Sequence, residues 1–128
     1  MPTTPQHTFP KAEKLCSDRA IEQLFAEGAS TMKYPLRSVY RPNGGEQTHV
    51  LISVSKKRFK HAVDRNRVKR LIREAFRLNK QLLAPTAKLD LAFIFIGNRL
   101  PDFATISKSV THILERINND VNSSQSEN

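Results

Sequence analysis

The chain has 128 residues and a formal net charge of +9, from 21 Lys and Arg against 12 Asp and Glu. This length fits one domain with one hydrophobic core, and no stretch approaches the ~20 apolar residues of a membrane helix. The single cysteine excludes an intramolecular disulfide and a thiolate metal cluster, and the lack of a signal-peptide pattern near the N-terminus predicts a cytoplasmic protein.

The first part of the sequence predicts a flexible arm followed by a short helix. Residues 1–12 contain three prolines among polar residues and cannot bury a core. Ser17-Asp18 then offers a helix cap, and Gly28 offers a C-terminal stop. Between them lies a stripe of apolar side chains at helical spacing: Ala20, Ile21, Leu24 and Phe25. We therefore expect a helix of about ten residues.

Two strands are expected next. Residues 36–41 and 48–54 alternate or run apolar, and they flank the turn sequence Pro42-Asn43-Gly44-Gly45. A turn of this composition between two strand-like segments favours a β-hairpin. The sequence thus predicts that these two strands pair with each other.

A second helix, a third strand and a last helix complete the predicted domain. The second helix should run from about residue 62 to 83, where Pro85 prevents its continuation. Residues 89–96 form the most apolar run, which is typical of a strand covered on both faces. The last helix should open at Pro101-Asp102, and the polar segment from Asn118 predicts disorder.

The order αββαβα predicts an α+β fold, an α-β sandwich in which helices pack on a small sheet of mixed strands. The expected organisation is a single domain over residues 13–121, with the flexible arm over residues 1–12 and a disordered tail over residues 122–128.

The positive charge is concentrated in residues 56–80. This segment holds eleven basic side chains and two acidic ones, Asp64 and Glu74, which leaves ten of each sign in the rest of the chain. A localised positive field attracts a polyanion and releases its counterions. We therefore favour a nucleic acid as the partner over an anionic membrane surface or an acidic protein.

Within the predicted second helix, the basic side chains gather on one face. A turn of 100° per residue places an apolar set on the side of the sheet: Val68, Leu71, Ile72, Ala75 and Phe76. The outward face carries a polar set, with two further residues on its flanks: Asn66, Arg70, Arg73 and Arg77, flanked by Arg67 and Lys69. Arg can hold two phosphate oxygens at once. Glu74, which can pair with Arg70 or Arg77, cannot balance this face, so a bound anion would relieve the repulsion.

The segment Ser53-Val54-Ser55-Lys56-Lys57, followed by the run RNRVKRLIREAF at residues 65–76, resembles the signature of the bacterial ribonuclease P protein. The resemblance covers about residues 9–121. It implies the protein component of an endoribonuclease whose chemistry is carried by a partner RNA with bound Mg²⁺. The implied partners are that ribonuclease P RNA and precursor transfer RNA, with no membrane and no further protein required. It also implies a left-handed βαβ crossover, where a right-handed one is the rule.

The resemblance further implies which residues bind RNA. The contacts with the catalytic RNA, extended by the basic stripe, would be made by Lys56, Lys57, Arg65, Asn66, Arg67, Lys69, Arg70, Arg73 and Arg77. The precursor leader would lie in a cleft between the first helix and the sheet, lined by Phe25, Tyr40, Ser53 and Ser55. Bases stack on aromatic rings at roughly 1–3 kcal/mol each. Ile21 stands where the family often has an aromatic residue, so weaker leader binding is expected, and Phe25 also fits an ordinary core position.

Catalysis by the chain itself is not predicted. The four histidines, His7, His49, His61 and His112, show no metal-ligand spacing, and Asp64 is expected to cap the second helix or to pair with a nearby Arg. A ribosomal or RNA-assembly structural protein is the main alternative. A DNA-binding module is disfavoured, because a hairpin and not a supporting helix precedes the basic helix.

Overall fold

The structure is a computed structural model that describes residues 18–43, 48–83 and 88–126, with side chains described as far as residue 120. In chain order the elements are α1 (Asp18–Glu27), β1 (Ala29–Lys33), β2 (Leu36–Pro42), β3 (His49–Ser53), α2 (Ala62–Asn79), the short 3-10 helix η2 (Lys80–Leu82), β4 (Leu89–Phe95) and α3 (Phe103–Ser126). None of the helices in these ranges is long and apolar enough to cross a membrane.

The four strands form one mixed sheet in the order β1-β2-β4-β3. β2 is antiparallel to both of its neighbours, β1 and β4, whereas β3 and β4 are parallel. The chain passes from β3 to β4 through α2, which makes a βαβ unit. The predicted α+β sandwich is confirmed. The left-handedness of the β3–α2–β4 crossover stays a prediction.

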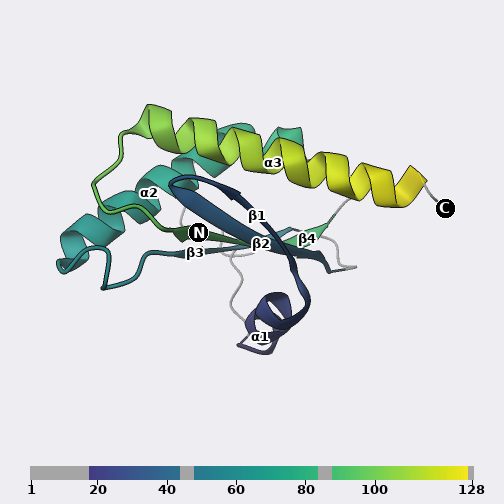
Figure 1. The fold of residues 1–128 in the computed structure, drawn as a ribbon, viewed down its shortest axis with the longest axis horizontal. Helices are drawn as coiled ribbons and strands as arrows, with labels where there is room; N and C mark the ends of the chain where they lie inside the picture. The colour runs from purple at the N-terminus through teal and green to yellow at the C-terminus, as the bar shows by residue number, and fades with distance from the viewer. Residues whose placement is uncertain (1–17, 44–47, 84–87, 127–128) are drawn as a thin grey trace, which may run out of the picture.

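The two faces of the sheet carry different helices, with α2 and α3 on one side and α1 on the other (Figure 1). Because side chains alternate along a strand, Leu36 and Tyr40 of β2 enter the large core beneath α2 and α3, whereas Val39 faces α1. There Val39 and Ala92 pack against Leu24. The larger core takes the bulky side chains of β4: Leu89, Leu91, Phe93 and Phe95.

The end of α1 approaches β2 so closely that only glycine fits. A Cβ atom on Gly28 would lie 2.4 Å from the carbonyl oxygen of Leu24 and 2.7 Å from Cγ1 of Val39. The Gly28 N–H donates a hydrogen bond to the same Leu24 oxygen at 2.8 Å. This contact sets the position of α1 over the sheet.

The predicted hairpin of residues 36–41 and 48–54 is wrong. Both segments form strands, but β4 lies between them and pairs with each. The physical reason is burial: six of the seven residues of β4 are buried, and a strand covered on both faces needs hydrogen-bonding neighbours on both edges. The turn residues Gly44 and Gly45 lie outside the described residues.

The true hairpin joins β1 to β2, and β1 was not predicted. In β1 the Ala29–Lys33 segment has a half-buried Thr31 and four exposed residues, so its sequence carries no apolar alternation. Its pairing with β2, from Ala29 opposite Tyr40 to Lys33 opposite Leu36, makes it a strand. The fold is therefore αβββαβα, with one more strand than predicted.

The helix ends also differ from the predictions. α2 stops at Asn79 and continues as η2, and α3 runs to Ser126, so the predicted disorder from Asn118 is wrong for residues 118–126. Ser and Asn are weak helix formers but do not break a helix, and no Gly or Pro follows Pro101 in this segment. The arm over residues 1–12, the proposed cap Ser17, Pro85 and residues 127–128 lie outside the described residues.

Candidate RNA-binding surface

The basic helix α2 presents a row of polar side chains away from the core. Its inner side is buried against the sheet and α3, through Val68, Ile72, Ala75 and Phe76. The outer side carries Asn66, Arg67, Arg70 and Arg73, all exposed. Within the described part of the chain, these four side chains make no hydrogen bond or ion pair. Their donors are therefore available to a ligand.

Arg65 differs from its neighbours, because its side chain donates hydrogen bonds to backbone carbonyls of the same protein. Its Nη1 donates to the carbonyl oxygens of Phe59 at 2.9 Å and of Lys60 at 3.0 Å. The Phe59 ring stacks on Phe95, with centroids 5.6 Å apart. The segment before α2 is thus fastened to the core from two sides, and Lys56, Lys57 and Lys60 project from it, exposed.

Arg77 and Lys69 are the less available members of the basic face. Arg77 forms an ion pair with Glu74, in which its Nε donates to Oε2 at 3.2 Å. This hydrogen bond raises the pKa of the Arg77 guanidinium above its ordinary value. Lys69 is half-buried. The one acidic residue of the outer face therefore pairs with Arg77 and not with Arg70, which leaves the positive charge concentrated toward the start of the helix.

The N-cap residue of α2 differs from the predicted one, Asp64. Asp64 lies in the first turn of α2, and His61 occupies the N-cap position without a side-chain hydrogen bond to the helix. A carboxylate in the first turn still stabilises a helix through its dipole. Asp64 is half-buried.

On the opposite face of the sheet, α1 offers an exposed aromatic ring. Phe25 is 48% exposed and belongs to neither apolar cluster, so its interpretation as a core residue is wrong. Ser53 is half-buried on β3, and it lies on the α1 face because it follows Leu51, which packs there, by two residues. Ser55 is exposed just beyond the strand, and Ile21 packs against the apolar cluster under α1.

Tyr40 does not share that face, so its prediction as a cleft residue is wrong. It is 7% exposed, lies in the core on the side of α3, and donates a hydrogen bond from its hydroxyl to Oδ2 of Asp120 at 2.7 Å. Burial, and then this hydrogen bond, raise the pKa of Tyr40 to about 12. Alternation along β2 turns Val39 toward α1 in its place.

A polar network that sequence reasoning missed holds the α1 face together. Arg41 pairs with Glu27 at 3.2 Å and donates to Gln23 at 3.3 Å, which ties α1 to β2. Next to it the buried Asp90 accepts from Asn43 at 3.1 Å, and its Oδ1 lies 3.2 Å from Nδ1 of His49. No motif signals these contacts, because they join four separate segments of the chain: α1, residues 41–43, β3 and β4. His49, predicted as a surface residue, is half-exposed.

The family described as Ribonuclease P matches residues 9–118 of the chain. The chain belongs to the ribonuclease P protein family. The ribonuclease P protein component of Porphyromonas gingivalis W83 is 40% identical over 136 residues, covering 100% of this chain and 99% of that protein.

Solved structures of ribonuclease P proteins agree with the fold. The protein from Thermotoga maritima has a TM-score of 0.71 at 29% identity, over 81% of this chain and 96% of that one. The protein from Staphylococcus aureus has a TM-score of 0.72 at 26% identity, over 84% and 96% of the two chains. Membership of the ribonuclease P protein family makes this chain a subunit of the ribonucleoprotein that processes transfer RNA, with a ribonuclease P RNA as partner. The alternative of a ribosomal or assembly protein is not favoured.

Proposed function

We propose that this chain binds ribonuclease P RNA through the start of α2 and the loop before it, and holds the leader of precursor transfer RNA over the α1 face. The complex would work in the cytoplasm, with Mg²⁺ held mainly by the partner RNA. The chain's own contribution is attachment and positioning, and the RNA performs the cleavage.

One observation supports the proposal above others: the exposed row of Asn66, Arg67, Arg70 and Arg73, which have no partner within the described residues. Like charges three and four residues apart on a helix repel one another. A phosphate backbone laid along this row would supply the missing counter-charge and would release its own bound cations. Asn66, an amide among guanidinium groups, can accept a hydrogen bond as well as donate one, for example from a water of a hydrated metal ion.

The remaining predicted contacts divide by what the structure does with each side chain. Lys56 and Lys57 are exposed and extend the surface at its start. Arg65 holds the loop that carries them, through its two backbone hydrogen bonds, and so acts as a positioning residue. Lys69 and Arg77, which are half-buried, would contribute less.

Leader contact is assigned to Phe25 with Ser53 and Ser55. An aromatic ring that is 48% exposed over a partly polar sheet face offers a stacking surface to an unpaired base. Since Tyr40 is buried on the other face and Ile21 is aliphatic, Phe25 is the one aromatic side chain among the predicted cleft residues that remains in place. We therefore propose that leader affinity depends strongly on Phe25.

The test is cleavage of precursor transfer RNA by a bacterial ribonuclease P RNA at low Mg²⁺, with and without the chain. The wild-type chain should restore cleavage, and Arg70→Glu should lose most of this effect. Arg116→Glu, the same charge reversal on an exposed position of α3, is the matched control and should retain it. RNA binding without restored cleavage would contradict the proposal.

A further inference from the structure

One end of the sheet gathers segments that are far apart in the sequence. The β1–β2 turn at Tyr34-Pro35 lies there, since Ile96 donates its N–H to the Pro35 carbonyl at 2.8 Å, just beyond β4. Ser109 of α3 donates to the Tyr34 carbonyl at 3.0 Å. The parallel pairing of β3 with β4 brings the end of β3 to the same edge. We call this region, residues 33–37, 53–58 and 95–102 with Lys108, the sheet end.

The basic loop before α2 is joined directly to this region. Arg58 donates from Nη1 to Oδ1 of Asn98 at 3.1 Å, across 40 positions of sequence. Gly97 sits so close to Pro35 that a Cβ atom on it would lie 3.1 Å from the Pro35 Cβ. A continuous line of contacts therefore leads from the loop that precedes α2, over the end of β4, to the β1–β2 turn.

The sheet end is strongly positive. It carries seven exposed basic side chains: Lys33, Arg37, Lys56, Lys57, Arg58, Arg99 and Lys108. The one acidic residue in these segments is Asp102, and its Oδ1 accepts the N–H of Thr105 at 2.8 Å at the start of α3. Four of the seven lie outside the basic segment 56–80, in parts of the sequence where positive and negative charges balance: Lys33, Arg37, Arg99 and Lys108. Folding therefore brings these positive charges together.

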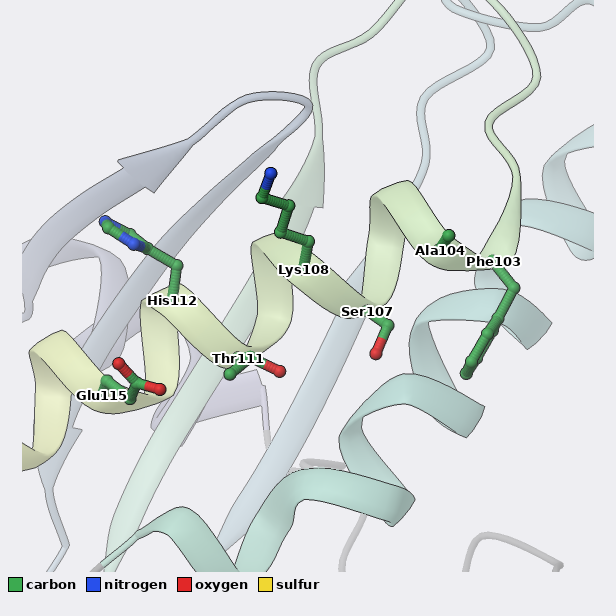
Figure 2. A pocket seen from close by; sticks show the side chains of 7 residues that line it. All are labelled: Phe103, Ala104, Ser107, Lys108, Thr111, His112 and Glu115. Atoms are coloured by element: carbon green, nitrogen blue, oxygen red, sulfur yellow. The ribbon is translucent and has the colours of Figure 1, made fainter.

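Lys108 reaches the region from α3. Figure 2 shows its side chain extending on the side of the helix where the β1–β2 turn passes, whereas Ser107 points to the other side; both residues line the groove along α3. The neighbouring Ser109 is the residue that bonds to the turn. The groove itself has mixed polarity and no feature that selects an occupant, whereas Lys108 extends toward the turn.

An aromatic side chain stands among these cations. Tyr34 is 63% exposed, and within the described residues its ring and hydroxyl have no partner. Its backbone, in contrast, is held at the carbonyl by Ser109, and the following Pro35 is buried. The ring is thus presented on a fixed support, beside the exposed Met32.

We propose that the sheet end is a second RNA contact of this protein, one that takes an unpaired stretch of RNA. Tyr34 stacks on a base, while Lys33, Arg37, Arg99 and Lys108 hold the backbone phosphates on either side of it. Exposed aromatic rings within a positive surface are how proteins bind single strands without reading their sequence. The inference rests on the proposed function, because the RNA it takes belongs to the same ribonucleoprotein or to its substrate.

Tyr34 is separate from Phe25, the aromatic residue of the leader surface, whereas Ser53 and Ser55 belong to both regions. α1 is tied to Arg41, near the other end of β2, and Arg41 lies five residue steps along the strand from Leu36 at the turn. At 3.3 Å per residue that separation is roughly 17 Å. The two aromatic rings therefore serve different parts of an RNA strand.

The fluorescence of Tyr34 provides a direct test. The chain has two tyrosines and no tryptophan, and Tyr40 is buried and bonded to Asp120. In a Tyr40→Phe protein, Tyr34 is the only tyrosine, so its emission reports base stacking. Titration with a ten-nucleotide oligouridylate should quench it, with the same Kd that anisotropy of labelled RNA gives. Absence of quenching at saturating RNA would overturn the proposal.

Substitutions in the wild-type background separate stacking from charge. Tyr34→Ala should weaken oligouridylate binding by about tenfold, near the lower end of the range for one stacked base, and Tyr34→Phe should stay within about twofold of wild type. Met32→Ala, which removes an exposed apolar side chain from the same hairpin, is the matched control. Equal affinity of Tyr34→Ala and Met32→Ala would refute the proposal. Failure of the wild-type chain to restore cleavage by ribonuclease P RNA would instead refute the proposed function. The oligouridylate measurements would still test whether the sheet end binds unpaired RNA.

Discussion

Arg65 and Arg67 lie two positions apart in the same motif, yet the structure predicts opposite effects for their removal. Arg65 donates to the carbonyls of Phe59 and Lys60, whereas Arg67 is exposed and has no partner within the described residues. Arg65→Gln should therefore reduce the stability of the free protein. Arg67→Gln should leave stability unchanged and weaken the binding of ribonuclease P RNA.

The magnitudes of these effects on stability and on RNA binding follow from the contacts of Arg65 and Arg67. A hydrogen bond with a charged donor contributes about 1.5–3 kcal/mol, and water can replace part of it at the half-buried Arg65, so the free energy of unfolding should fall by about 1–3 kcal/mol. The corresponding change for the exposed Arg67 should stay within about 0.5 kcal/mol. In RNA binding, each neutralised phosphate adds about 0.7–0.9 to the slope of log K against log salt. Arg67→Gln should reduce the slope by that amount, and Arg65→Gln by less.

Urea unfolding followed by far-ultraviolet circular dichroism gives the first quantity, and binding of ribonuclease P RNA between about 50 and 200 mM salt gives the second. Arg65→Lys is the informative control, because it keeps the charge and loses the guanidinium fork. It should be destabilised like Arg65→Gln. The reasoning fails if Arg65→Gln is as stable as wild type and lowers the salt slope as much as Arg67→Gln does.

Three further outcomes are expected. Tyr40→Phe removes the hydrogen bond to Asp120 and should lower the free energy of unfolding by about 1 kcal/mol. Because folding raises the pKa of Tyr40 from 10.0 to about 12, the stabilisation by this hydrogen bond is present below pH 10 and lost toward pH 12. The free energies of unfolding of wild type and variant, measured in urea, should therefore converge as the pH rises through this range. Gly28→Ala forces a Cβ against the Leu24 carbonyl and should lower the free energy of unfolding by about 1–3 kcal/mol, with an exposed Ser30→Ala as control. Asp90→Ala leaves its two partners without their shared acceptor and should cost about 1–3 kcal/mol in thermal unfolding.

The sequence was sufficient for the elements that carry a strong pattern. α2 was predictable because Val68, Ile72 and Phe76 repeat at helical spacing, and β4 because its residues are apolar almost without a break. The exposed row on α2 followed from the same periodicity. Each of these predictions depends on residues close together in the chain, where sequence distance and spatial distance agree.

The failures arise where partners are distant in sequence. β1 becomes a strand by pairing with β2, so its own five residues gave no signal. The family resemblance placed Tyr40 in the cleft, whereas Val39, one residue before it, faces α1. In a strand, a shift of one residue moves a side chain to the other face. The role of Arg65 was hidden for a related reason, since its acceptors are backbone carbonyls of Phe59 and Lys60 whose position depends on the loop.

The place of β4 in the sheet also affects how the protein is made. β4 is the last strand to leave the ribosome. β2 can pair with β1 before then, but β2 lacks its second neighbour and β3 lacks its one neighbour until β4 is made. A translation product that stops before residue 89 has no central strand on which α1 and α2 can pack from opposite sides. In such fragments the apolar side of α2 has no complete sheet to pack on, so we expect the helix to be less stable and the fragments to compete poorly with complete subunits for the RNA.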